Sequence, residues 1–299
     1  MIIQYIKLFF GVIIFSTFFS QNLFADKQSV PVDISSKDWC PKNMKAWDEK
    51  EFNHVFILID RTSFLESEQK AWIKSSIFNE QFALNLEPYT QISVMFIDNT
   101  SVQEQKLIWD GCRMKTGEDN TEWKGDNIFD DEAPPIVKGW YKKFIGSWNG
   151  INKKITSRTA DNSFIYESIV RAITDTEFQF NSKDYKNRKL IVVSDLLQFS
   201  KHLSFYAACK ASASNKTMSK CSSLEQIMSN QANHDYIKFT KPKDVKNLSV
   251  ELLFLNYEYE ANEEIHTSLI DLWGELFKYM GIDIPTDQTE WVTRQLRFG

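Results

Sequence analysis

The 299-residue sequence predicts an α/β fold, a three-layer sandwich with a mainly parallel central sheet. Three observations support this prediction. Short apolar runs alternate with amphipathic helical patterns across residues 52–282, which is typical of strands joined by crossover helices. The runs are apolar almost throughout, as expected for parallel strands that are covered on both faces. The composition is that of a globular chain, with 42% hydrophobic and 25% charged residues.

The predicted strands are four short apolar runs. Three of them end in an aspartate, and the carboxyl ends of parallel strands meet at one edge of a sheet, where ligands bind in such folds. The four runs are Val55–Asp60, Gln91–Asp98, Lys189–Asp195 and Leu248–Tyr257.

The segment after the first strand predicts an amphipathic helix. Trp72, Ile73 and Ile77 share one helical face, and Ser63 with Glu66 forms the S-x-x-E pattern of a capping box. We therefore expect Ser63 to be a helix cap.

Further helices are predicted along the chain from the same spacing. One spans residues 134–151, where large apolar residues recur every four positions, another begins near Ser163, and a third spans Ile265–Ile282. Short helices are expected at 203–209 and 224–230. Residues 110–133 carry many acids without a clear period, so they predict a long loop.

The first 25 residues have the features of a secretory signal peptide. Lys7 precedes the apolar run Leu8–Phe19, which is short for a membrane-spanning helix, and Ala25 suits cleavage. An uncleaved N-terminal anchor is the alternative. After the signal peptide, we expect an N-terminal extension at 26–51, the α/β domain at 52–282 and a C-terminal tail at 283–299. An exported chain, periplasmic or secreted, is the expectation, with no stable membrane span after signal removal.

The four cysteines all follow this signal. In an oxidising compartment an even number indicates disulfides. Cys209 and Cys221 flank a polar stretch and are 12 positions apart, so we pair them, which leaves Cys40 with Cys112. A zinc site is the alternative, although the chain has no C-x-x-C pair to support it.

Hydroxyl and carboxylate side chains are expected to converge at the carboxyl edge. Asp60 and Asp195 each end a strand, Thr62 follows the first, and Ser163 stands at a distant helix start; Asp98 has a similar place after the second strand. Oxygen ligands of this kind suit Mg²⁺ or Mn²⁺. The plainer interpretation is that the aspartates and Ser163 only cap the following helices.

These residues resemble a divergent von Willebrand factor A-type domain over roughly residues 52–282. In that family the first strand ends in D-x-S-x-S, a later loop supplies a threonine before a helix, and a further strand ends in an aspartate. DRTSF matches Asp60 and Thr62 to the first two positions and puts Phe64, which is expected to pack beneath the loop, at the third.

The rest of the motif matches in part. Ser163, in DNSFIYESI, falls at the loop threonine, and Asp195, in VVSD, falls at the later aspartate. The resemblance is closest to an uncharacterised group of exported bacterial proteins of this type. It implies a metal site that lacks one ligand, with water or a partner's carboxylate completing the coordination.

The resemblance implies a module that binds another protein. A metal-assisted hydrolase using Asp60 and Asp195 is the enzymatic alternative, and a metal-free structural subunit of an envelope assembly is the third hypothesis. The chain has 35 Lys and Arg against 40 Asp and Glu, a net charge of −5, so overall charge predicts no attraction to nucleic acid or to anionic membranes.

Overall fold

The computed structural model describes residues 40, 52–87, 89–98, 101–113, 135–155, 161–209, 221–255 and 263–294. The predicted signal peptide, and the predicted N-terminal extension apart from Cys40, lie outside these residues. Within the described ranges, no helix is both long enough and apolar enough to cross a membrane.

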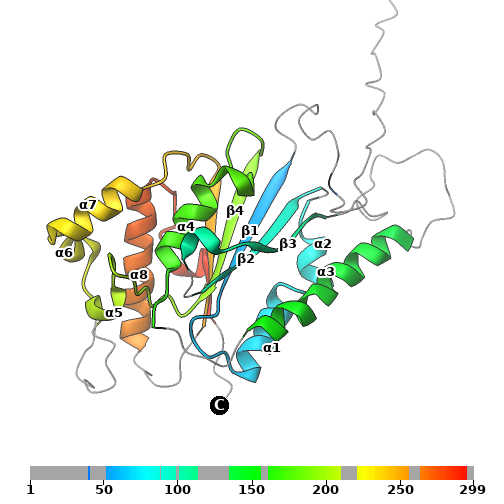
Figure 1. The fold of residues 1–299 in the computed structure, drawn as a ribbon, viewed down its shortest axis with the longest axis horizontal. Helices are drawn as coiled ribbons and strands as arrows, with labels where there is room; N and C mark the ends of the chain where they lie inside the picture. Colours follow the sequence, from blue (N-terminus) through cyan, green and yellow to red (C-terminus); the bar gives the residue numbers. More distant parts are fainter. Residues whose placement is uncertain are drawn as a thin grey trace, which may run out of the picture. The chain divides into compact units, whose positions relative to one another are not determined.

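A six-stranded sheet forms the centre of the protein, with the order β3-β2-β1-β4-β5-β6 (Figure 1). Every neighbouring pair is parallel except β2 with β3. The predicted fold class, with its mainly parallel sheet, is therefore confirmed. The strands are β1 (Asn53–Asp60), β2 (Gln91–Ile97), β3 (Leu107–Cys112), β4 (Asn187–Ser194), β5 (Leu248–Phe254) and β6 (Val292–Arg294).

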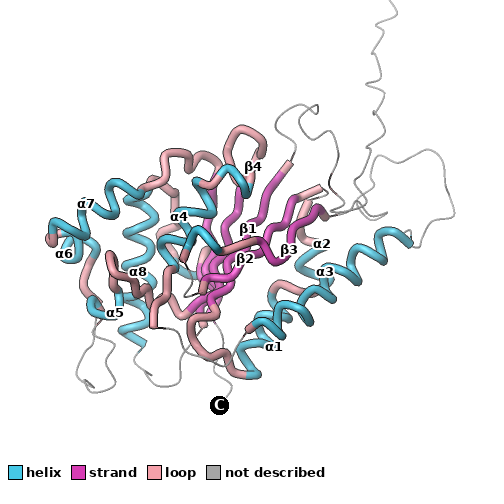
Figure 2. Tube along the Cα trace, viewed as in Figure 1, coloured by secondary structure: helices cyan, strands magenta, loops and turns pink. Residues whose placement is uncertain are grey.

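Helices cover both faces of the sheet (Figure 2). They are α1 (Ser67–Ser76), α2 (Glu80–Leu84), α3 (Pro135–Lys154), α4 (Ile165–Thr174), α5 (Phe205–Ala208), α6 (Leu224–Met228), α7 (Gln231–Thr240) and α8 (Glu263–Met280), with 3₁₀ turns η2 (Val102–Glu104), η4 (Thr176–Phe178) and η5 (Gln288–Glu290).

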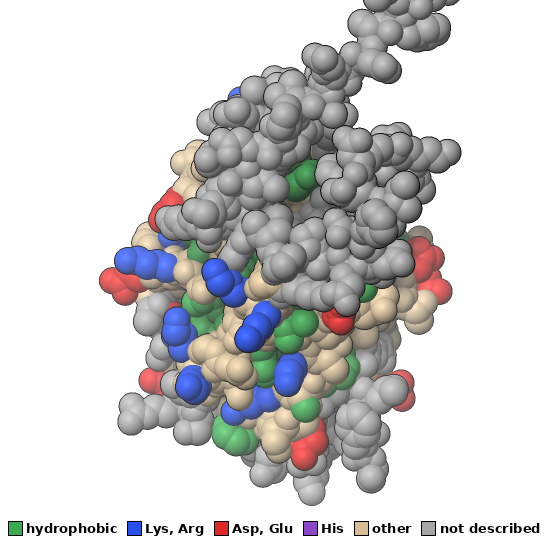
Figure 3. All heavy atoms as spheres, turned by 90° about the vertical axis from the view of Figure 1, so that its right-hand side faces the viewer, with side chains coloured by type: hydrophobic (Ala, Val, Ile, Leu, Met, Phe, Trp, Pro, Cys, Tyr) green, Lys and Arg blue, Asp and Glu red, His purple; other side chains and the backbone are tan. Residues whose placement is uncertain are grey.

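Alternate residues of each strand enter two separate cores, because successive side chains of a strand point to opposite faces. In β1, Phe56 and Leu58 pack with α4 and α8, whereas Ile57 and Ile59 pack with α1, α2 and α3. Figure 3 views the face formed by α1–α3, where Lys and Arg side chains lie among hydrophobic groups. The apolar runs of the sequence therefore reflect burial on both faces.

Several boundaries differ from the predictions. α1 begins at Ser67, and the N–H of Glu66 donates to Gln69 Oε1 at 3.0 Å, so Ser63 is not the helix cap. Residues 107–112, partly inside the predicted loop 110–133, form β3, which pairs with β2; residues 114–134 lie outside the description. The predicted C-terminal tail contains η5 and β6, and β6 extends the sheet beside β5.

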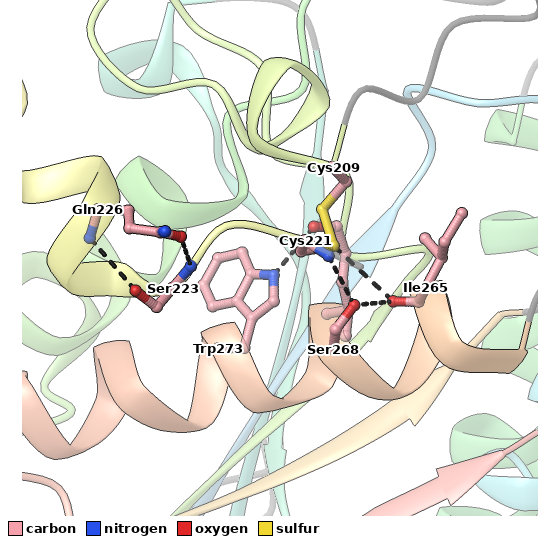
Figure 4. Close-up of a disulfide and its surroundings, with 8 residues drawn as sticks. Cys209, Cys221, Ser223, Gln226, Ile265, Ser268 and Trp273 are labelled. Atoms are coloured by element: carbon pink, nitrogen blue, oxygen red, sulfur yellow. Dashed lines mark hydrogen bonds between the residues drawn. A yellow bond between two sulfur atoms is a disulfide. The ribbon is translucent and has the colours of Figure 1, made fainter. Parts of the chain in front are cut away.

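Both predicted disulfides are present. Cys40 bonds to Cys112, the last residue of β3, and Cys209 bonds to Cys221. The second disulfide is fixed to α8, because the N–H of Cys221 donates to Ser268 Oγ at 2.8 Å (Figure 4).

Candidate functional site

The carboxyl ends of β1 and β4 form the centre of the candidate site. From β1 the chain builds the sheet outward through β2 and β3, and from β4 it continues the other way through β5 and β6. The site therefore lies at the point where the strand order reverses, which is where open α/β sheets bind ligands.

Asp60, the last residue of β1, is buried and accepts hydrogen bonds on both carboxylate oxygens. Oδ1 accepts from the N–H of Thr62 at 2.9 Å and from Thr62 Oγ1 at 2.6 Å. Oδ2 accepts from Ser194 Oγ at 2.7 Å and from Ser163 Oγ at 3.3 Å. One neighbouring hydroxyl, from Thr62, and two distant ones, from Ser163 and Ser194, thus surround one carboxylate.

Ser163 reaches this carboxylate from the segment before α4. Its N–H donates to the carbonyl of Phe199 at 2.8 Å, and the N–H of Phe199 donates back to the Ser163 carbonyl at 2.9 Å. Its Oγ lies 3.0 Å from Thr62 Oγ1. Ser163 is therefore held by the loop after β4 and contributes a hydroxyl to the site, and Phe164 is the residue at the N-cap of α4.

Asp195 follows β4 directly and is also buried. Its Oδ2 accepts from Ser63 Oγ at 3.2 Å, and its Oδ1 accepts from the N–H of Leu197 at 3.0 Å. The structure therefore brings together all four predicted residues, Asp60, Thr62, Ser163 and Asp195, and it adds Ser63 and Ser194.

The backbone after Asp195 has an unusual conformation. Leu196 has a φ of 64°, in the left-handed region that a branched side chain rarely adopts. Two hydrogen bonds hold it there: its N–H donates to Ser194 Oγ at 2.8 Å, and Trp273 Nε1 on α8 donates to its carbonyl at 2.9 Å. Strained backbone of this kind is concentrated at functional sites.

The two carboxylates carry charge that no cation offsets within the described part of the chain, where neither Asp60 nor Asp195 forms an ion pair. Burial raises the pKa of Asp60, although its hydrogen bonds oppose this shift. Burial, together with the negative charge of Asp60, raises the pKa of Asp195 to about 7. The pair therefore favours a bound proton or a bound cation.

Arg61 is adjacent to Asp60 in sequence, but it forms an ion pair with Asp98. Its Nη2 lies 2.8 Å from Asp98 Oδ2, its Nη1 donates to the Lys154 carbonyl at 2.7 Å, and its guanidinium stacks 4.5 Å from the centre of the Phe96 ring. Asp98 is thus neutralised by Arg61 and does not join the cluster.

Phe64 does not pack beneath the loop as expected, since 44% of its surface is exposed. The position that would supply a third hydroxyl in D-x-S-x-S is therefore an aromatic side chain at the rim of the site. Lys70 Nζ lies 5.7 Å from the centre of its ring.

The donor set fits a hard divalent cation in chemistry, because every polar side chain of the cluster offers oxygen. The hydroxyls of Thr62 and Ser163 lie within hydrogen-bond distance of Asp60 and of each other, so an ion would have to share their oxygens with this network. The carboxylates number only two, and no group of three or more Asp, Glu, His or Cys side chains that could hold a metal occurs among the described residues. This set would hold a cation weakly.

Ser63 and Ser194 were missed from sequence. Ser194 lies beside Asp60 because the parallel register pairs Ile59 with Val193, and only the structure supplies that register. Ser63 fitted the sequence pattern of a helix cap, and nothing in the sequence indicated its contact with Asp195.

No protein-family model matches the sequence, and no curated protein matches it either. Similar solved structures include proximal thread matrix protein 1 from the mussel byssus, with 12% identity over 78% of this chain and a TM-score of 0.33. They also include a von Willebrand factor type A structure from Catenulispora acidiphila, with 8% identity over 77% of this chain and a TM-score of 0.32. The matches cover 48% and 42% of those chains, so this chain spans less than half of either structure. The fold class, α/β with a mainly parallel sheet between two helical layers, rests on the strand order of this chain and not on these matches.

Proposed function

We propose that this protein is an exported binding module of von Willebrand factor A type, which binds a protein partner at the carboxyl edge of its sheet. A Mg²⁺ or Mn²⁺ ion held by Asp60, Thr62, Ser163 and Asp195 would accept a carboxylate from the partner. The observation that carries the proposal is the pair of buried aspartates at the reversal of strand order, with hydroxyl groups around them and no cationic side chain paired with them in the described residues.

The electrostatics of the pair support a role in binding. Burial raises the pKa of both carboxyl groups, and the charge of Asp60 adds to the rise at Asp195, so a divalent cation would relieve both burial and repulsion. The ion would act as a bridge between this chain and an acidic side chain of the partner. With Phe64 at the third motif position, one protein ligand is replaced by water or by the partner, which predicts weak binding of the ion alone.

A thermal-unfolding titration tests the metal. Millimolar Mg²⁺ or Mn²⁺ should raise the melting temperature of the wild type and leave that of Asp60→Asn unchanged. Asp161→Asn is the matched control, because Asp161 is exposed just before Ser163 and should retain the wild-type response. An unchanged melting temperature for the wild type, with no heat of binding by calorimetry, would remove the ion from the proposal and favour a metal-free structural subunit.

Export is the second part of the proposal. It is supported by the apolar run Leu8–Phe19 ahead of Ala25 and by the two disulfides, which persist in oxidising compartments. N-terminal sequencing of the protein from an envelope or secreted fraction should find Asp26 first. Recovery of the chain from the cytosol with Met1 intact would contradict it.

A metal-assisted hydrolase is the second candidate, and one observation favours it. A carboxyl group with a pKa of about 7, as in Asp195, is suited to proton transfer at neutral pH. Hydrolysis of simple phosphate or carboxylate esters that is stimulated by Mg²⁺ and lost in Asp195→Asn would support this function. Equal rates in the wild type and in that variant would exclude Asp195 as the acid or base.

A further inference from the structure

The amino edge of the sheet carries a basic surface, at the opposite end from the candidate site. The segment from the end of α7 into β5 reads KFTKPKDVKN and contains four lysines and one acid. We call Lys238, Phe239, Lys241, Lys243 and Lys246 the basic amino-edge surface. Its charge is positive although the chain as a whole carries −5.

The one acid in this segment is directed inward. Asp244 Oδ1 lies 3.3 Å from Nη2 of the buried Arg188, and its Oδ2 accepts from the N–H of Ser182 at 2.8 Å. Asp244 therefore pairs with Arg188 and not with the lysines of this segment, among which Lys238 also lies near enough to Asp235 to lower the pKa of that carboxyl.

The lysines themselves face outward. Among the described residues, Lys238, Lys243 and Lys246 form no ion pair, and Lys241 Nζ lies 5.0 Å from the centre of the Tyr279 ring. Their ammonium groups are therefore available to an anionic surface.

Phe239 projects from the middle of these charges. Its side chain is 81% exposed, about twice the exposure of Phe64 at 44% or Phe199 at 43%. It borders an open groove that is also lined by Lys241, Lys243 and Met280. Covering a large apolar side chain this exposed is favourable, because it removes apolar surface from water.

We propose that the basic amino-edge surface binds an anionic phospholipid membrane, with Phe239 inserted among the acyl chains and the lysines against the headgroups. Charge complementarity supports this occupant, because each lysine near an anionic bilayer strengthens binding. The cations are all lysines, whose compact charge suits diffuse headgroups, whereas arginine forks are favoured for fixed carboxylate or phosphate partners. This inference is independent of the proposed protein-binding site.

A bilayer also fits the shape of this surface better than an acidic protein does. Phe239 protrudes and would need a matching pocket on a folded partner, whereas a bilayer yields to a single inserted ring. The lysines flank the ring and can bind headgroups while their methylene chains remain near the apolar boundary.

Sedimentation with vesicles tests the proposal on the full chain. We expect binding to vesicles rich in phosphatidylglycerol, little binding to pure phosphatidylcholine, and weaker binding as salt is raised. Phe239→Ala should weaken binding about tenfold, and the triple variant Lys238→Gln, Lys241→Gln, Lys243→Gln at least tenfold.

The matched control removes the same charge elsewhere. Lys74, Lys142 and Lys153 are exposed on α1 and α3, and their triple substitution by Gln should change binding less than twofold. All variants keep residues 1–25, so any affinity from that apolar segment is common to them, and unchanged melting temperatures would show that they are folded.

Three results would overturn the proposal. The wild type could fail to bind anionic vesicles, the control variant could lose as much binding as the amino-edge variant, or the wild type could bind both lipids equally. Binding to polyglutamate without binding to vesicles would assign the surface to an acidic protein partner instead.

Discussion

Ser194 Oγ donates a hydrogen bond of 2.7 Å to Asp60 Oδ2, across the boundary between β4 and β1. The same Oγ accepts the N–H of Leu196 at 2.8 Å. One small side chain thus links the end of β1 to the left-handed turn that follows Asp195. It fixes the relative positions of the two carboxylates before any ligand is bound.

Removal of this hydroxyl should destabilise the site. Ser194→Ala leaves the Leu196 N–H without its acceptor and Asp60 with one donor fewer, so we expect a loss of about 1–2 kcal/mol in the free energy of unfolding. The pKa of Asp60 should rise further, because a hydrogen bond to the charged form is lost. Urea unfolding measures the first effect and carboxyl NMR the second. Ser75→Ala, which removes an exposed hydroxyl on α1, is the control, and an equal loss in both variants would contradict the role of Ser194.

The raised pKa of Asp195 predicts a pH-dependent stability cost. Between pH 4 and pH 7 the folded protein retains a proton that the unfolded chain releases, so Asp195 makes stability fall as pH rises. Asp195→Asn lacks this group, and its stability relative to the wild type should therefore grow across that range, by about 1.4 kcal/mol per pKa unit. Urea unfolding in EDTA from pH 4 to pH 8 measures the difference. A constant difference across the range would show that Asp195 does not titrate there.

The lowered pKa of His54 predicts that stability depends on pH in the opposite direction from the effect of Asp195. His54 is fully buried beside Ser93 Oγ, at 2.8 Å from Nε2, and burial with the charge of Arg188 lowers its pKa to about 3. Below pH 6.5 the unfolded chain binds a proton that the folded protein excludes, so this group makes stability fall as pH falls. The His54 imidazole resonances should not titrate between pH 8 and pH 5. Titration of His54 near pH 6.5 would contradict its burial as a neutral group.

The two disulfides should stabilise the fold to different extents. On the chain-entropy model, the 12-residue separation of Cys209 and Cys221 corresponds to about 3 kcal/mol, and the 72-residue separation of Cys40 and Cys112 to about 4.4 kcal/mol. Double Cys→Ala variants of each pair, compared by urea unfolding, measure the two values. Peptide mapping without reduction supplies the control, since mixed pairings in the wild type would invalidate the comparison.

The sequence contained strong signals for elements that are buried on both faces. The runs at β1, β2, β4 and β5 are apolar because each strand is buried on both faces, so their positions and a mainly parallel sheet could be predicted. β3 escaped prediction because an edge strand is covered less, and its sequence LIWDGC includes an acid and a glycine. β6 has only three residues, too few for any periodic signal.

The site was predicted in part for a similar reason. Asp60 and Asp195 stand out as acids at the ends of apolar strands, and Thr62 and Ser163 matched a known pattern. Ser194 depended on the register of two strands that are more than a hundred residues apart, and local sequence does not encode that register. The exposure of Phe64 depends on the path of the loop after β1, which the sequence alone does not predict either.

The two edge strands of the sheet also affect whether one copy of this protein can pair with another through its sheet. One border is β6, only three residues long, and the other is β3, which runs antiparallel and carries a register shift opposite Val94 and Met95. Short strands, irregular pairing and exposed charge such as Asp110 all discourage the addition of a strand from another chain. Within the described residues, both borders of the sheet are thus poorly suited to pair with an edge strand of another copy.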